Sequence, residues 1–147
     1  MSEQDLSREI YTAAFRGYPD RLVTKAEVLY GGSKMEVDAL WDTGSSYTYI
    51  SRRLASQMGM ISVGQSGYIT PTGASISEQY VIEIILPDGT HVTDVHAGGS
   101  DIDAMGIDLI LGLQIILLGD FAIRHRDGQT FMSFLCPPND ATDNTKQ

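Results

Sequence analysis

One carboxylate in this chain stands in a setting suited to acid–base chemistry. Asp42 ends a stretch in which apolar and polar residues alternate, and Thr43 and Gly44 follow it. A carboxylate can activate a water molecule as a general base, but cleaving a stable amide also requires an acid. Two carboxylates that share one proton supply both, because two like charges held close together cannot both be ionised. Such a pair can hydrolyse a peptide bond without a metal ion or a covalent intermediate.

The chain contains a single Asp-Thr-Gly sequence and no internal repeat. One chain therefore holds half of a carboxylate pair, and the expected active unit is a homodimer. The residues that follow Asp42 fit this interpretation. Gly44 lacks a Cβ, so its backbone N–H can come close to the carboxylate. We expect the Thr43 hydroxyl to bond across the symmetric interface, and Ser45 or Ser46 to bond the outer carboxylate oxygen.

An apolar-apolar-glycine triplet, Ile110-Leu111-Gly112, follows much later in the chain. We expect it to pack beneath the Asp42 loop, with its apolar pair in the core and its glycine allowing a close approach. The candidate site thus consists of one catalytic residue, Asp42, and supporting residues on both segments. The supporting residues are Thr43, Gly44, Ser45, Ile110, Leu111 and Gly112.

The elements that must position these residues follow from local patterns. Alternating runs at 26–30 and 35–41 flank Gly31-Gly32 and predict a β-hairpin whose second strand ends at Asp42. Residues 7–16 fit either a short helix capped by Ser7 or a paired strand. Caps, turn residues and alternation also predict a strand at 47–50, a helix at 51–58 capped by Ser51 and ended by Gly59, a hairpin at 67–76, strands at 80–86 and 91–95, a loop at 98–101, a strand at 108–111, a helix at 113–118, and a hairpin of 121–125 with 130–135.

Composition places the chain among ordinary globular domains. It has 147 residues, of which 42% are hydrophobic and 20% charged, which suits one domain with its own core. A formal net charge of −9 argues against nucleic acid as a partner, because phosphates would be repelled. The single cysteine excludes an internal disulfide and suits a reducing compartment. No apolar run is long enough to span a bilayer and no signal peptide is expected, so the predicted location is cytoplasmic.

The order of these parts resembles the retropepsin-type aspartic proteases, the single-lobe family that includes retroviral proteases and retroviral-like proteases of bacteria and phages. The resemblance runs from 23 to 135 and is strongest at 39–46 and 106–123; the second stretch resembles the prokaryotic branch more than the viral one. It implies an all-β, single-lobe barrel with one or two short helices, and a homodimeric endopeptidase that uses no cofactor or metal. It also divides the chain into an N-terminal segment (1–22), a protease domain (23–136) and a disordered tail (137–147).

The resemblance further implies a flap, a hairpin that closes over a peptide substrate. Its expected substrate-binding residues are Ile69, Thr70, Pro71, Thr72, Gly73 and Ala74. Two features depart from the viral pattern. Leu113-Gln114 stand where viral members usually place Arg and then Asn or Asp, and the flap tip contains Pro71 and fewer glycines. The ionic ties of viral dimers are therefore not expected here.

The same residues allow other interpretations. A non-catalytic module of the same fold, used for protein binding or dimerisation, is the main alternative, and the intact Asp-Thr-Gly favours the enzyme. A protease that acts only in its own maturation is a third possibility. Asp101, Asp103 and Asp108 lack the spacing of an EF-hand and are interpreted as solvated or capping groups. The three histidines lack metal-ligand spacing, and Trp41 is interpreted as a packing residue beside the site.

Overall fold

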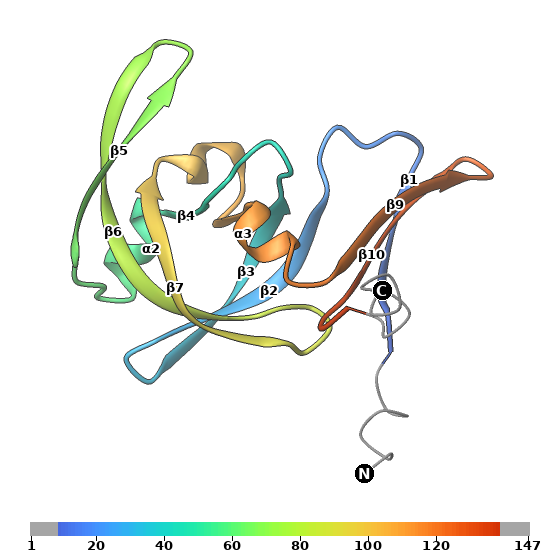
Figure 1. The fold of residues 1–147 in the computed structure, drawn as a ribbon, viewed down its shortest axis with the longest axis horizontal. Coiled ribbons are helices and arrows are strands. Elements are labelled where there is room, and N and C mark those ends of the chain that lie inside the picture. The colour runs from blue at the N-terminus through green and yellow to red at the C-terminus, as the bar shows by residue number, and fades with distance from the viewer. Residues whose placement is uncertain (1–8, 139–147) are drawn as a thin grey trace, which may run out of the picture.

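The chain folds into β-strands with short helices between them. The computed structural model describes residues 9–138, apart from the side chains of Tyr68 and Thr70. Figure 1 shows the strands curving into a barrel-like body, from which one hairpin projects. This arrangement confirms the predicted all-β, single-lobe class. The elements are β1 (Tyr11–Arg16), β2 (Val23–Tyr30), β3 (Ser33–Trp41), β4 (Thr48–Ser51), α2 (Arg52–Gln57), β5 (Gly64–Thr70), β6 (Gly73–Ile85), β7 (His91–Ser100), the 3₁₀ turn η1 (Ile102–Met105), β8 (Leu109–Leu111), α3 (Leu113–Ile116), β9 (Asp120–Arg126) and β10 (Gln129–Leu135).

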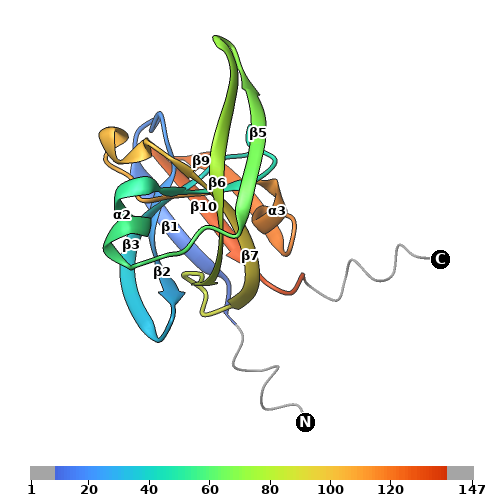
Figure 2. The ribbon, with the colours of Figure 1, turned by 90° about the vertical axis from the view of Figure 1, so that its left-hand side faces the viewer.

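Two sheets share the core. The larger sheet has the order β2-β3-β8-β4-β7-β6-β5, with β2 also pairing with β6, which curves the sheet back on itself. The smaller sheet has the order β1-β10-β9 and lies at the other end of the body from the projecting hairpin (Figures 1 and 2). One continuous apolar cluster, which includes Trp41, Ile84, Leu111, Met132 and Phe134, joins the two sheets.

The hairpin of β2 and β3 positions Asp42, which directly follows the end of β3. Its register runs from Val23 opposite Leu40 to Tyr30 opposite Ser33, with Gly31-Gly32 as the turn. Both glycines have positive φ values, 54° and 84°, as a two-residue hairpin turn requires. The predicted hairpin is therefore confirmed, and the signals for it were its turn residues and its alternation of apolar and polar residues.

Strand β8 passes between β3 and β4. It runs parallel to β3, with Ala39 opposite Leu109, and antiparallel to β4, with Ile50 opposite Leu109. Leu109 and Leu111 are fully buried, whereas Ile110 is half-buried. The short strand predicted at 108–111 is thus confirmed. Both of its faces are at least partly buried, which explains why its sequence is a continuous run of apolar residues.

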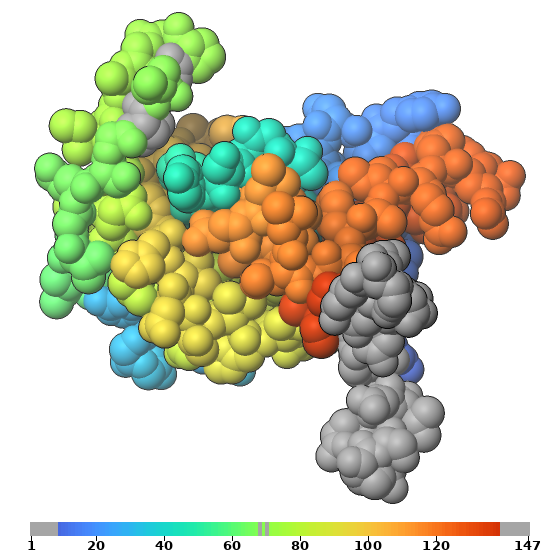
Figure 3. Space-filling view, in the orientation of Figure 1, coloured from blue at the N-terminus to red at the C-terminus, as the bar shows by residue number. Residues whose placement is uncertain are grey.

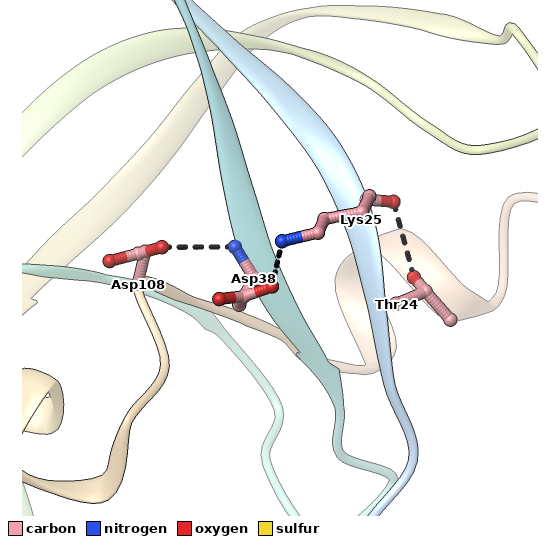
Figure 4. Close-up of polar contacts among 4 residues, drawn as sticks. All are labelled: Thr24, Lys25, Asp38 and Asp108. Carbon is pink, nitrogen blue, oxygen red and sulfur yellow. Dashed lines mark hydrogen bonds and ion pairs between the residues drawn. The ribbon is translucent and has the colours of Figure 1, made fainter.

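Asp108 fastens the start of β8 to β3. Its carboxylate accepts a hydrogen bond from the Asp38 backbone N–H at 2.9 Å, and its own N–H donates to the Asp38 carbonyl at 2.9 Å. On the other side of β3, the Lys25 ammonium lies 2.7 Å from the Asp38 carboxylate (Figure 4). That hydrogen-bonded contact raises the pKa of Lys25. Both ends of the ion pair are largely exposed, so the part-buried hydrogen bonds between Asp38 and Asp108 contribute more to the fold.

Trp41 is a packing residue, as the sequence suggested. Its indole N–H donates to the Thr24 hydroxyl at 2.9 Å inside the core. Its ring stacks on Phe121 with centroids 5.7 Å apart and lies tilted against Phe134 at 5.0 Å. Burial raises the pKa of the nearby Tyr11, and a hydrogen bond with Thr24 partly opposes that shift. Thr24 therefore links the aromatic groups of both sheets behind the site.

The N-terminal segment forms the strand and not the helix, the two alternatives expected for residues 7–16. Residues 11–16 form strand β1, paired antiparallel with β10 from Tyr11 opposite Phe134 to Arg16 opposite Gln129, so the helix alternative is wrong. Half-buried and exposed residues alternate strictly along this strand. That period of two was visible in the sequence, but the strand it must pair with lies at the far end of the chain. Ser7 lies outside the described residues.

The loop expected at 98–101 is a second correction. Gly98, Gly99 and Ser100 continue β7 and pair in parallel with β4. Glycine suits this position because of its close neighbours and not because of a turn. A Cβ on Gly98 would lie 3.0 Å from the Ser77 hydroxyl and 3.1 Å from the Tyr49 ring.

The other predicted elements are confirmed with small shifts at their ends. The Ser51 hydroxyl accepts the Leu54 N–H at 3.2 Å and caps α2, and Gly59 follows this helix with a φ of 68°. Strands β5 with β6, β6 with β7, and β9 with β10 form the three further hairpins.

Residues 139–147 of the predicted tail lie outside the described residues. Among the described helices, none has the length and apolar character needed to cross a membrane.

Thr24→Val is expected to destabilise the fold by about 1–3 kcal/mol, because the buried indole N–H of Trp41 loses its acceptor while the side-chain volume is kept. Chemical denaturation followed by the fluorescence of the single tryptophan measures the change. Thr12→Val, at an exposed position on β1, is the matched control and should change stability by less than about 0.5 kcal/mol. Equal stability of the two variants would show that Thr24 does not hold the indole.

Candidate active site

Asp42 lies at the point where β3 leaves the sheet. Its backbone N–H donates to the Leu111 carbonyl at 3.0 Å, so β8 fixes where the turn begins. The chain then folds tightly: the Gly44 N–H donates to the Asp42 Oδ1 at 2.9 Å, and the Ser45 N–H donates to the Asp42 carbonyl at 3.1 Å. A Cβ on Gly44 would lie 3.2 Å from Oδ1, closer than most such contacts. The carboxylate is therefore held at one oxygen, and the residue is only half-buried.

Gly112 holds the far side of the same loop. A Cβ at this position would lie 2.2 Å from the Tyr47 carbonyl oxygen and 2.7 Å from that of Ser45, distances that real Cβ atoms do not adopt. This close approach also allows a hydrogen bond at the next residue, where the Leu113 N–H donates to the Ser45 carbonyl at 2.7 Å. The structure thus brings the two predicted segments into direct backbone contact, and the close approach is the reason for the glycine.

Gln114 is a supporting residue that the sequence analysis noted only as a departure. Its side-chain Oε1 accepts the Thr48 N–H at 2.8 Å, and its own N–H donates to the Ser46 carbonyl at 3.1 Å. A neutral amide therefore ties α3 to the start of β4 within one chain. The sequence does show a hydrogen-bonding side chain two residues after Gly112. Its partner, the Thr48 N–H, could be identified only from the fold.

The hydroxyl groups of Thr43, Ser45 and Ser46, close to Asp42, differ in exposure and in hydrogen bonding. The Ser45 hydroxyl donates to the Tyr47 carbonyl at 2.8 Å and so stabilises the loop, instead of the expected bond to the outer carboxylate oxygen. Thr43 and Ser46 are exposed. An exposed Thr43 beside the carboxylate is available for contact with a second molecule.

A hollow of about 380 Å³ opens beside Asp42 and Thr43. Its remaining walls come from the loop before β2, the end of β3, η1 and β9. The Arg21 guanidinium donates to the Met105 carbonyl at 2.8 Å and joins two of these walls. The lining residues besides Asp42 and Thr43 are Pro19, Asp20, Arg21, Leu22, Leu40, Trp41, Met105, Phe121 and Ile123.

The hairpin of β5 and β6 projects from the body as a single arm (Figures 2 and 3). Its register runs from Gly64 opposite Gln79 to Thr70 opposite Gly73, with Pro71-Thr72 at the turn. Exposure is 90% at Ile69 and 67% at Ile76, so the arm carries apolar side chains that the chain itself leaves uncovered. This is the hairpin that contains the expected flap residues.

The root of this arm is built from hydrogen bonds. The Glu78 carboxylate accepts bonds from the Ser62 hydroxyl and, at 2.8 Å, from the Gln65 side-chain amide, and these bonds lower its pKa. A second hollow of about 330 Å³ lies inside the root, lined by residues of β4 to β7 and by Gln114. The Thr48 and Ser77 hydroxyls are buried here, and within the described structure neither has a hydrogen-bond partner.

The arrangement presents one carboxylate on a loop held from below, with an open hollow on one side and a projecting hairpin at one end of the body. Within residues 9–138, no cluster of three or more His, Cys, Asp or Glu side chains is arranged to hold a metal ion.

Comparison with solved structures identifies this fold as retropepsin-like. A retropepsin-like aspartic protease from Rickettsia conorii superposes with a TM-score of 0.57 and 14% identity, over 87% of this chain and 94% of that one. The EIAV protease, solved in complex with the inhibitor HBY-793, superposes with a TM-score of 0.51 and 17% identity, over 67% of this chain and 86% of that one. No family model and no curated sequence matches the chain.

Gly112→Ala is expected to cost more than about 3 kcal/mol, because a Cβ there would overlap two backbone carbonyl groups that cannot move independently of the site. Thermal or chemical denaturation gives the measurement. Gly67→Ala is the matched control, since its Cβ would meet only the Ser75 carbonyl at 3.8 Å, an ordinary contact. A folded Gly112→Ala variant with the stability of the control would contradict the close approach.

Proposed function

We propose that the protein is an aspartic endopeptidase, active as a homodimer in which each copy supplies one Asp42. The observation that carries the proposal is the Asp42 loop itself. Its carboxylate receives the Gly44 N–H, and the loop is held from below by Gly112 and Leu113. The loop presents this carboxylate half-exposed beside an open hollow, where a substrate and a second carboxylate can reach it.

The chemistry follows from two such carboxylates sharing one proton. The ionised carboxylate of one copy removes a proton from water as the water oxygen attacks the peptide carbonyl carbon. The protonated carboxyl of the other copy donates its proton to the carbonyl oxygen, and the tetrahedral intermediate then collapses as the amide nitrogen is protonated. No cofactor is needed for this sequence. Because each group acts once as base and once as acid, the symmetric pair suits both half-reactions.

The projecting hairpin supports a peptide as the substrate. An arm with uncovered Ile69 and Ile76 gains apolar contacts only when something lies against it. Closing the arm over an extended peptide would bury these side chains and exclude water from the carboxylates. Gly73 permits close approach of the substrate backbone because it has no side chain. The chain's single cysteine and its acidic charge suit a cytoplasmic enzyme that acts on protein and not on nucleic acid.

A non-catalytic module of the same fold remains the second candidate function. The exposed arm would serve such a module equally well, since binding a protein segment does not require an acid. The intact Asp42-Thr43-Gly44 and its backbone support favour the enzyme, and variants at Asp42 separate the two possibilities.

Asp42→Asn is expected to reduce peptide cleavage by about 10²–10⁴-fold, because an amide can neither accept the water proton nor share one. The measurement is turnover of a diverse peptide library by the purified protein, with product masses identifying the cleaved bonds. Asp38→Asn, four residues earlier on the same strand, is the matched control and should keep its activity, since its carboxylate bonds only the exposed Lys25 among the described residues. Chelation of metal ions should also leave activity unchanged. Cleavage by Asp42→Asn at the wild-type rate would refute the proposal.

Gly73→Val is expected to reduce turnover much more than it reduces stability. Gly73 has a φ of 135°, so valine strains the tip of the arm, where little else is packed. Gly89→Val is the matched control, because Gly89 is also a hairpin glycine with a φ of 92° but lies in the β6–β7 turn. Both variants should lose similar stability, and only Gly73→Val should lose activity.

Hydrogen exchange gives an independent measurement of the arm. Backbone amides at 70–74 should exchange rapidly in the free protein and slowly with a statine-type peptide inhibitor bound. Equal protection in both states would show that the arm does not close over a ligand, even if Asp42 is catalytic.

A further inference from the structure

The hollow of about 330 Å³ at the root of the arm lies on one face of the larger sheet. Strands β4, β7, β6 and β5 are neighbours in that order, and residues paired directly across them point to the same side. The pairs that line the hollow are Tyr49 with Gly98, Gly98 with Gln79, and Ser77 with Ser66. The hollow is therefore built from one set of side chains that share a face of the sheet.

A glycine in the middle of one row creates the hollow. Gly98 lies between Tyr49 and Gln79 in the row across β4, β7 and β6, so a gap separates these two side chains. A Cβ on Gly98 would lie 3.0 Å from the Ser77 hydroxyl oxygen, 3.1 Å from the Tyr49 ring and 3.2 Å from the Gln79 Nε2. A hydroxyl, an aromatic ring and an amide thus surround the same point above Gly98.

Two of these groups have unused hydrogen-bonding capacity. The Ser77 hydroxyl is buried, and within the described residues it has no hydrogen-bond partner. The side-chain amide of Gln79 likewise forms no hydrogen bond with a group in residues 9–138. An unpaired buried hydroxyl costs free energy, so a polar group that fills the gap and bonds to it is favoured.

The lining also determines which polar group fits, because it contains no Lys, Arg, Asp or Glu. A charged group would lose its water there without meeting an ion of opposite sign. An aliphatic group would leave Ser77 and Gln79 unpaired. A neutral amide avoids both costs, since it carries two N–H donors and a carbonyl acceptor.

We propose that this hollow binds the side-chain amide of a Gln or Asn residue of the peptide substrate, with Gln79 and Ser77 as the specificity-determining residues. Two amides can pair through two hydrogen bonds, each donating an N–H to the carbonyl of the other. The Gln79 amide would bond the substrate amide in this way, and the Ser77 hydroxyl would bond its remaining N–H or lone pair.

The position of the hollow suits a substrate side chain. Its lining joins Ser66 and Gly67, at the root of the arm, to Tyr47, which follows the Asp42 loop. A peptide held between the arm and that loop therefore passes the hollow. This inference deepens the proposed function and rests on it, because it names a residue that the substrate carries.

Cleavage products test the preference directly. In a peptide-library digest, Gln or Asn should recur at one fixed position relative to the cleaved bond. Replacing that residue by Met, which has a similar shape without the amide, should lower kcat/KM about 10–100-fold, as expected for two lost hydrogen bonds. Replacement by Glu should lower it at least as much. Equal cleavage of the Gln and Met peptides would overturn the proposal, and so would a preference for Glu, which would indicate a charged His96.

Variants of the protein link the preference to the hollow. Gln79→Met should cleave the Gln and Met peptides with similar kcat/KM, so the two substitutions should be non-additive. Ser77→Ala should reduce the preference about 5-fold without lowering the melting temperature, because the lost hydroxyl has no partner. Gln129→Met, the same substitution at an exposed position on β10, is the matched control and should keep the preference. A Gln79→Met variant with the full preference would overturn the proposal.

The hollow can also be tested without cleavage. In nuclear magnetic resonance of the Asp42→Asn protein, the side-chain amide signals of Gln79 should shift on titration with acetyl-Ala-Ala-Gln-Ala-Ala-amide and not with its Met analogue. Such shifts in a protein whose wild type cleaves nothing would keep the amide site and refute the proposed function. Cleavage without a Gln or Asn preference would keep the function and overturn the amide site. Absence of both cleavage and shifts would refute both.

Discussion

The fold depends on one close backbone contact, the approach of Gly112 to the carbonyl oxygens of Ser45 and Tyr47. No other residue fits there, because a Cβ would lie 2.2 Å from the nearer oxygen. The contact requires β8 to pass between β3 and β4, and it places the first N–H groups of α3 against the loop that carries Asp42. The hydrogen bonds of this crossing connect segments that are distant in the sequence. The position of Asp42 is therefore a property of the whole larger sheet and not of its own hairpin.

Around this rigid centre the two ends of the body are left incomplete. At one end the β5–β6 arm exposes apolar side chains, and at the other the β9 edge exposes backbone groups. Exposed strand edges and apolar arms favour association, so a chain that keeps both gains stability when something binds there. Strand β3, which ends at Trp41 directly before Asp42, belongs to the part of the body between these two ends (Figure 1). A peptide lying under the arm would cover its apolar side chains.

What could be predicted from the sequence was what local chemistry determines. The turn at Gly31-Gly32, the cap at Ser51 and the buried strand at 109–111 each carry their signal within a few residues, and each was found. The loop predicted at 98–101 was wrong, because the glycines there are explained by contacts with residues that are distant in the sequence. Gly98 favours a turn by composition, yet it lies in strand β7, where a Cβ would make tight contacts with Ser77 and Tyr49.

The same limit applies to the residues around Asp42. The close approach at Gly112 and the N–H of Gly44 were anticipated, because both follow from the absence of a Cβ. The Ser45 hydroxyl bonds to the Tyr47 carbonyl, and Gln114 bonds to the Thr48 N–H, because of how the loop and α3 are placed in three dimensions. Strand β1 likewise became distinguishable from a helix only once its partner β10 was known. Side-chain hydrogen bonds that join distant segments have no signature in the spacing of residues.

The nature of the central contact also explains how so little sequence can specify this architecture. Superposition with the Rickettsia conorii protease covers 87% of the chain at 14% identity. Most of the bonds at the crossing join backbone groups, so they constrain residue type only where a side chain would obstruct them or where the core must stay apolar. Gln114 illustrates the freedom that remains, since a neutral amide ties α3 to β4 through a backbone N–H. A fold held by backbone contacts can change most of its side chains and still keep the same arrangement of strands and helices.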